Sequence, residues 1–356
     1  MRIALIAPLV TPIGELHLGG AQAVLADLAR GLSRRGHDVV VYAARGSAVD
    51  GVPVAPVDVD SSLLQADLFR EGLERGPSLA MLAAYGAVYA DVREQCFDLV
   101  HNHGFDAPAI LVAAEMDVAV LHTLHLPPSP VIADAIATVR RGTTSVWCAA
   151  VSQAHASGWA ELIALDAVLS NGVPADEIPF HAQATRSAVI AARFSAEKGV
   201  DEGIAASRHA GWPIDVYGTS YDAAYEHAVR ERWADDPEVR FHPPLRRADL
   251  WEALGTATAA LCLSRWDEPF GMVAAEAQAA GTPVIASRLG GLIEVVQDEV
   301  TGYLVPPADV AAAASALARV PVLSRHACRL HAQRSLSLDG SVDAHEALYA
   351  QLAGRR

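Results

Sequence analysis

The chain has 356 residues, of which 52% are hydrophobic and 19% are charged, a composition that predicts folded domains and excludes global disorder. Its formal net charge of −15 disfavours nucleic acid as a partner, because such binding relies on neutralising phosphates. No apolar run is long enough and free enough of charge to span a bilayer. We therefore expect a cytoplasmic protein without a transmembrane segment, with peripheral membrane contact left open and no oligomeric state assigned.

Strand-like and helical runs alternate along the first half of the chain. Strands rich in Val, Ile and Ala are predicted at 2–7, 38–43, 97–101, 117–122 and 146–151, and helices at 20–35, 78–94, 106–114, 130–141 and 153–164. Because these strands lack polar alternation, they are typical of a parallel sheet covered by helices on both faces. After the first strand, Gly19 and Gly20 either bring backbone amides to a phosphate or serve only as turn residues. The motif G-x-G-x-x-G is absent there, which disfavours a dinucleotide-dependent oxidoreductase.

Histidines gather where two predicted strands end, in His101-Asn102-His103 and in His122-Thr123-Leu124-His125. Three interpretations stay open: hydrogen-bonded structural histidines, a catalytic role for one of them, and a metal site formed by converging imidazoles. Of the three, the metal site is the one that we do not favour.

The D-x-D sequence of the first half and the four cysteines are interpreted as structural features. Asp58-Val59-Asp60 is interpreted as loop polarity and not as a metal-binding D-x-D. The four cysteines form no C-x-x-C pair, so we interpret all of them as reduced core residues.

The alternation of strands and helices restarts near residue 187. Strands are predicted at 187–192, 213–217, 238–241, 258–263 and 283–286, with helices at 199–210, 222–233, 246–255 and 271–280 between them. The two series predict an α/β protein with two Rossmann-like, doubly wound parallel-sheet domains facing across a cleft that would hold a ligand. The glycine- and proline-containing stretch 171–184 marks the boundary, which gives domains at 1–175 and 176–338 and a C-terminal segment at 339–356.

Lys198 is the only lysine in the chain, since every other basic residue is arginine. It follows Arg193 in the turn between a predicted strand and a predicted helix. Lysine is a compact point charge and arginine a planar fork, so an arginine-biased chain retains lysine where arginine would not serve. Two cations at such a turn predict a diphosphate site, the alternative being a solvated surface lysine.

Two glutamates belong to a second strand–loop–helix unit, in the string Glu268-Pro-Phe-Gly-x4-Glu276. A carboxylate has two acceptor oxygens and suits ligand hydroxyls, such as those of a ribose. Gly271 allows the backbone to approach a ligand, and the start of the helix offers free N–H groups. The alternative is an ordinary amphipathic helix with Glu268 as its N-terminal charge.

The string from Glu268 to Glu276 resembles the Glu-x7-Glu signature of the retaining glycosyltransferases of family 4, which have the GT-B fold. Arg193-x4-Lys198 is similar to that family's diphosphate-binding pair, and Thr123-Leu124-His125 to a motif whose histidine lies at the reaction centre. The donor-binding residues that the resemblance implies are Gly19, Gly20, Arg193, Lys198, Gly218, Leu245, Glu268, Phe270, Gly271, Met272, Val273 and Glu276. The catalytic residues that it implies are His125, Glu268, Lys198 and Arg193. Apart from the resemblance, we keep His101 and His103 as candidate acceptor-side groups.

The resemblance implies a retaining hexosyltransferase-type enzyme that moves a sugar from a nucleotide diphosphate, with UDP the first candidate, to a hydroxyl acceptor without a metal cofactor. It also implies that a C-terminal helix, at about 339–352, crosses back to the first domain. The loop His242-Pro243-Pro244 lacks the family's usual glycine, so the identity of the donor's nucleotide base is not assigned. The alternatives are a GT-B sugar-nucleotide epimerase or hydrolase and a non-catalytic nucleotide-sugar-binding protein. The arginine- and alanine-rich composition suggests, as a further hypothesis, a role in antibiotic biosynthesis.

Overall fold

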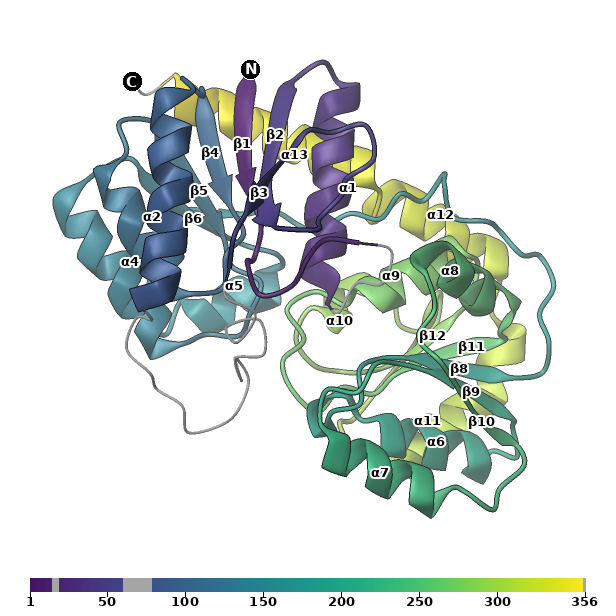
Figure 1. Cartoon of the computed structure of the whole chain (residues 1–356). Coiled ribbons are helices and arrows are strands. Elements are labelled where there is room, and N and C mark those ends of the chain that lie inside the picture. Colours follow the sequence, from purple (N-terminus) through teal and green to yellow (C-terminus); the bar gives the residue numbers. More distant parts are fainter. Residues whose placement is uncertain (15–18, 60–78, 355–356) are drawn as a thin grey trace. The chain divides into compact units, whose positions relative to one another are not determined.

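The computed structural model describes residues 1–14, 19–59 and 79–354, and the chain divides into two compact units (Figure 1). Unit 1 comprises Met1–Ser170 and Ser341–Arg356, and unit 2 comprises Asn171–Gly340. Each unit is a parallel sheet with helices on its faces, so the predicted α/β class with two doubly wound sheets is confirmed. Among the described helices, none is long and apolar enough to cross a membrane.

Seven parallel strands form the sheet of unit 1, in the order β3-β2-β1-β4-β5-β6-β7. They are β1 (Arg2–Ile6), β2 (Asp38–Ala44), β3 (Val54–Val57), β4 (Leu99–Asn102), β5 (Ala119–Thr123), β6 (Val146–Ala150) and β7 (Ala167–Val168). The sequence did not predict β3 and β7, which are the two edge strands. β3 contains Pro56, a residue that edge strands tolerate because the missing N–H interrupts no central ladder, and β7 has only two residues.

The helices of unit 1 are α1 (Gly20–Arg34), α2 (Leu79–Glu94), α3 (Ala107–Leu111), α4 (Pro130–Gly142), α5 (Gln153–Trp159) and most of α13 (Leu338–Ala353). A short 3-10 helix, η1 (Val112–Glu115), continues α3. Buried side chains of α2, α3 and α4 pack against one face of the sheet. Beyond α1, Arg35 contacts Asp343 and Glu346 at N–O distances of 2.5 and 2.9 Å, so α13 lies against this unit.

Six parallel strands form the sheet of unit 2, in the order β10-β9-β8-β11-β12-β13. They are β8 (Ala188–Ala191), β9 (Ile214–Tyr217), β10 (Val239–His242), β11 (Ala259–Cys262), β12 (Val284–Ser287) and β13 (Gly302–Val305). The sequence prediction stopped at β12 and did not include β13. That strand begins at Gly302, where a Cβ atom would lie 1.9 Å from the carbonyl oxygen of Val284, so only glycine fits beside β12.

Helices cover both faces of this second sheet. They are α6 (Val200–His209), α7 (Ala223–Arg232), α8 (Arg247–Thr256), α9 (Met272–Ala279), α10 (Leu292–Val295), α11 (Val310–Arg319) and α12 (Arg325–Ser335), with the 3-10 turns η2 (Ala196–Lys198) and η3 (Val320–Val322). The first two and α11 lie on one face, and α8, α9 and α12 lie on the other (Figure 1). This two-sided cover explains why the central strands β8, β11 and β12 are largely apolar, whereas β9 and the edge strand β10 contain Asp215 and Arg240.

One interpretation of the cysteines is wrong. Cys148 and Cys328 are buried and Cys262 is half-buried, and all four thiols are free. Cys96, however, is exposed, because it lies in the turn after α2 with a φ of 52°. Asp58, of the D-x-D sequence, forms an exposed ion pair with Arg45, whereas Asp60 lies outside the described residues.

Candidate functional site

The strand order of unit 2 reverses direction between β8 and β11. These strands are neighbours in the sheet, and the chain leaves them toward opposite edges, first to β9 and later to β12. In doubly wound sheets the loops diverge at such a point, and ligands bind outside the carboxyl ends of the two strands. The loops concerned are 192–199, after β8, and 263–271, after β11.

Gly199 allows close backbone contact between these two loops. Its φ is 63°, in the left-handed region, and a Cβ atom there would lie 2.0 Å from the carbonyl oxygen of Leu263. The backbone N–H of Arg265 also donates to the carbonyl of Glu197, at 2.8 Å. The position of Lys198 relative to the second loop is therefore fixed by backbone contacts on both sides of it.

Lys198 and Glu268 form an ion pair across the two loops. The Lys198 Nζ lies 2.9 Å from Glu268 Oε1 and 2.6 Å from Oε2, and the side chains are 18% and 17% exposed. Ser264 Oγ and Trp266 Nε1 donate to the same Oε2, at 3.1 and 3.0 Å. Burial by itself would raise the pKa of Glu268, but the Lys198 charge and the three hydrogen-bond donors outweigh it and lower that pKa below its usual value. Glu268 is therefore an anion at neutral pH.

Arg193 supplies a second cation beside this pair. Its Nη2 donates to Glu197 Oε1 at 3.0 Å, and its guanidinium lies 4.6 Å from the ring centre of Tyr221 and 5.9 Å from that of Trp266. The sequence predicted two cations here but did not predict that each contacts a carboxylate. An anionic ligand must therefore compete with Glu197 and Glu268 for them.

The loop after Glu268 brings backbone amides to the start of α9. Phe270 is buried, and Gly271 precedes the helix with a φ of 108°. A Cβ atom at Gly271 would lie 2.6 Å from Leu292 Cδ2, so the turn requires glycine. Met272 and Val273 open the eight-residue helix, where backbone N–H groups have no partner within the helix. Gly291 also stabilises this loop, since its N–H donates a hydrogen bond to the Glu268 carbonyl at 2.6 Å.

Glu276 is held by an arginine that the sequence did not single out. Only 4% of Glu276 is exposed, and Nε and Nη2 of Arg247 both lie 2.8 Å from its Oε1. Arg247 begins α8 and also packs over the ring of Trp251, at 5.0 Å. The contact thus joins the start of α8, which follows β10, to α9, which follows β11. The one feature of the sequence that could have pointed to Arg247 is an arginine pair at the start of a predicted helix.

Two further predicted residues follow β9 and β10. A Cβ atom at Gly218 would lie 2.0 Å from the carbonyl oxygen of Ala192, so this glycine allows the loop after β9 to pack on the loop after β8. Leu245 is half-buried between β10 and α8. The residues that follow β8, β9 and β10 therefore all belong to the carboxyl edge of one sheet.

The predicted residues of unit 1 lie at the corresponding edge of its sheet. Gly19 precedes α1 with extended backbone, and Gly20 is its first residue. His103 follows β4, and His125 follows β5, the neighbouring strand. His103 Nδ1 and His125 Nε2 are 2.8 Å apart, so one ring donates a hydrogen bond to the other. Burial lowers the pKa of His125 to about 3, so both rings are neutral near pH 7.

Three of the four histidines lie together and His122 does not, since the ring centres of His101 and His103 are 4.0 Å apart and those of His103 and His125 are 5.0 Å apart. His101 pairs in register with Leu121 and contacts Thr123 Oγ1 at 2.7 Å, whereas His122 points to the other face because side chains alternate along a strand. His101 also contacts Tyr349 Oη at 2.5 Å and is fully buried. Since both ring nitrogens are occupied within the protein, the acceptor-side role predicted for His101 does not fit its geometry. Within the described residues, no group of three or more His, Cys, Asp or Glu could hold a metal ion.

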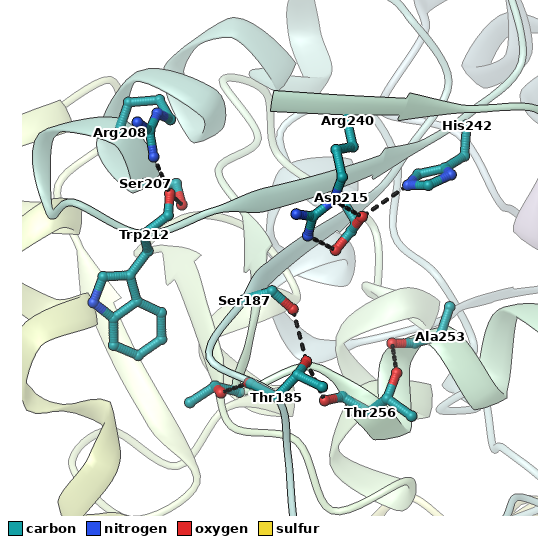
Figure 2. Close-up of polar contacts among 11 residues, drawn as sticks. Thr185, Ser187, Ser207, Arg208, Trp212, Asp215, Arg240, His242, Ala253 and Thr256 are labelled. Carbon is teal, nitrogen blue, oxygen red and sulfur yellow. Dashed lines mark hydrogen bonds and ion pairs between the residues drawn. The ribbon is translucent and has the colours of Figure 1, made fainter. Parts of the chain in front are cut away.

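A cavity of about 410 Å³ in unit 2 contains none of the predicted residues. Asp215 lies in it and contacts Arg240 at 2.7 and 2.8 Å and His242 at 2.8 Å, as Figure 2 shows. Thr185 and Ser187, at its other side, hydrogen-bond to each other at 3.0 Å. Because these polar groups already have partners within the protein, we assign the cavity no part in the candidate site.

Comparison with known proteins supports one family. Residues 18–177 match Glycosyltransferase Family 4, and residues 177–328 match Glycosyl transferases group 1. The chain is 29% identical to a glycogen synthase of Mycobacterium tuberculosis, covering 100% of this chain and 95% of that protein.

Solved structures share the fold. AviGT4, a glycosyltransferase involved in avilamycin A biosynthesis, superposes with a TM-score of 0.72 at 20% identity, over 99% of this chain and 98% of that one. HepE of Anabaena, solved in complex with UDP-glucose, gives a TM-score of 0.78 at 19% identity, over 99% of this chain and 100% of that one. The chain therefore belongs to the GT-B glycosyltransferases, with a family 4 domain followed by a group 1 domain.

Proposed function

We propose that this glycosyltransferase moves a sugar from a nucleotide diphosphate, with UDP the first candidate, to a hydroxyl acceptor, with retention of anomeric configuration and without a metal ion. The observation that carries the proposal is the Lys198–Glu268 pair between β8 and β11, with Arg193 beside it. HepE, with the same fold, binds UDP-glucose, which supports the choice of UDP.

The chemistry needs stabilisation of a departing diphosphate. The bond between the anomeric carbon and the diphosphate oxygen breaks, and negative charge develops on the leaving group. The acceptor hydroxyl oxygen bonds to the same carbon on the same face, and its proton passes to the departing diphosphate oxygen. Lys198, Arg193 and the backbone amides of residues 271–273 would stabilise that charge, with no metal needed for the purpose. Preorganised groups of this kind are typically the largest single contribution to catalysis.

The remaining residues would hold the rest of the donor. Glu268 would accept hydrogen bonds from sugar hydroxyls, and Glu276 would hold the ribose through a carboxylate that Arg247 has already oriented. We propose that Gly218 and Leu245 border the base. In unit 1, we propose that Gly19 and Gly20 approach the donor phosphate, that His125 acts at the reaction centre, and that His103 is on the acceptor side.

The division of the chain is part of the proposal. Unit 2 would bind the nucleotide sugar, since it contains both glutamates and both cations. Unit 1 would bind the acceptor. The segment of α13 that packs on unit 1 would belong to the acceptor-binding unit.

A thermal-shift screen against UDP, GDP, ADP and dTDP tests the base, with a nicotinamide dinucleotide as the negative control. A labelled donor is then incubated with and without candidate hydroxyl acceptors, and epimerised or hydrolysed sugar formed at the same rate in both, with no transfer product, would favour the alternative enzymes. Lys198→Ala and Glu268→Ala are expected to lower turnover by about 100-fold or more while the protein still folds. Wild-type turnover in both variants would contradict the assignment. Product anomer analysis and turnover in EDTA test retention and metal independence.

A further inference from the structure

Trp266 lies beside three of the four charged side chains of the proposed donor site, Glu268, Lys198 and Arg193. Its indole N–H donates to Glu268 Oε2 at 3.0 Å. The Lys198 ammonium lies 4.9 Å from its ring centre, and the Arg193 guanidinium lies 5.9 Å from it. Both distances are within the range of cation–π attraction. A half-buried aromatic side chain thus connects the acid and the two cations.

The two oxygens of Glu268 have different partners. Oε2 accepts hydrogen bonds from Lys198, Ser264 and Trp266, whereas Oε1 contacts Lys198 alone among the contacts of the described chain. A diphosphate that attracts Lys198 would remove one partner from each oxygen. Oε2 would keep two donors, and Oε1 would be left with a vacant acceptor position.

We propose that Trp266 is a positioning residue, which together with Ser264 holds Glu268 by Oε2 so that Oε1 is presented to a hydroxyl of the donor sugar once Lys198 contacts the diphosphate. The ring of Trp266 also lies within cation–π range of the ammonium and of the guanidinium. This inference rests on the proposed function and adds an assignment for each carboxylate oxygen. Trp266 is not among the site residues that the sequence predicted.

The test separates the N–H group from the ring. Trp266→Phe keeps an aromatic ring beside the cations and removes the donor to Oε2. We expect kcat for UDP release from UDP-glucose to fall by about 10- to 100-fold, as for loss of a hydrogen bond to a charged group. The Kd for UDP, measured by calorimetry, should stay within about threefold of wild type, because the cations keep their aromatic neighbour. Trp266→Leu removes both features, so it should lower kcat and also weaken UDP binding.

Trp233 offers a matched control. Its indole N–H donates to Asp201 Oδ1 at 2.7 Å, and the Arg232 guanidinium lies 5.2 Å from its ring centre. Trp233→Phe therefore makes the same chemical change on the same unit, but neither Asp201 nor Arg232 belongs to the proposed donor site. It should keep the wild-type kcat and Kd.

The outcomes distinguish this inference from the proposed function. If wild-type protein binds UDP and turns over UDP-glucose, and Trp266→Phe matches Trp233→Phe in kcat, the positioning role is refuted and the function stands. If Trp266→Phe raises the Kd for UDP and leaves kcat unchanged, Trp266 contributes to binding only, and the assignment of Oε1 and Oε2 is refuted. If wild-type protein binds no nucleotide at all, both the function and the inference are refuted.

Discussion

Glu268 competes with the proposed diphosphate for Lys198, so removing its charge should have opposite effects on binding and on turnover. In Glu268→Gln the amide keeps the size of the side chain, and Lys198 loses the carboxylate that lies 2.6 Å away. Exposed ion pairs contribute about 0–1 kcal/mol, and breaking buried pairs costs about 3–5 kcal/mol. With the two side chains 18% and 17% exposed, we take about 1–2 kcal/mol for this partly buried pair.

Released from that competition, Lys198 should bind UDP about 5- to 30-fold more tightly in Glu268→Gln. Turnover of UDP-glucose should nevertheless fall, because the acceptor for the sugar hydroxyl has lost its charge. Calorimetry with UDP at pH 7.5 gives the first quantity, and UDP release gives the second. Glu231→Gln is the control, since it removes the same charge from a side chain that is 77% exposed. Equal or weaker UDP binding in Glu268→Gln, or equal tightening in the control, would refute the competition.

Three further predictions concern stability and loop packing. Arg247→Met should lower the free energy of unfolding by about 3–5 kcal/mol, because it leaves the buried Glu276 carboxylate unpaired, and adding Glu276→Gln should restore part of the loss in a denaturation series. Burial lowers the pKa of His122 to about 3, so protonation in the unfolded state alone should cost about 2 kcal/mol between pH 7 and pH 5, and His122→Leu should flatten this dependence of melting temperature on pH. An unchanged slope would contradict the burial of a neutral ring. Gly199→Ala should weaken UDP binding and stability more than Gly211→Ala, which has a similar φ of 73° but no atom within 4 Å of the new Cβ.

Local patterns in the sequence determined the fold class. The strands of both sheets were predicted where apolar runs of strand length recur without polar alternation, because a parallel strand is buried on both faces and needs no help from distant residues to be recognised. The edge strand β3 was missed because it contains Pro56, and β13 because it begins with a glycine. In both cases one residue that is depleted in strands interrupts the local pattern, and pairing with a neighbouring strand decides the structure.

In the candidate site, too, local sequence patterns identified residues, and the tertiary structure decided which of them are in contact. The single lysine and the Glu-x7-Glu spacing pointed to Lys198 and Glu268 from composition and motif alone. That these two residues are in contact follows from β8 and β11 being neighbours, which no local pattern can specify for residues 70 positions apart.

The sequence by itself determined which residue types were available for a phosphate and for hydroxyl groups, because these chemical properties belong to the side chains. Only the tertiary structure decided their partners: Glu197 for Arg193, Arg247 for Glu276, and Trp266 beside both cations. The physical reason is that an ion pair or a ring contact depends on a separation of a few ångströms, and the packing of strands and loops sets that separation.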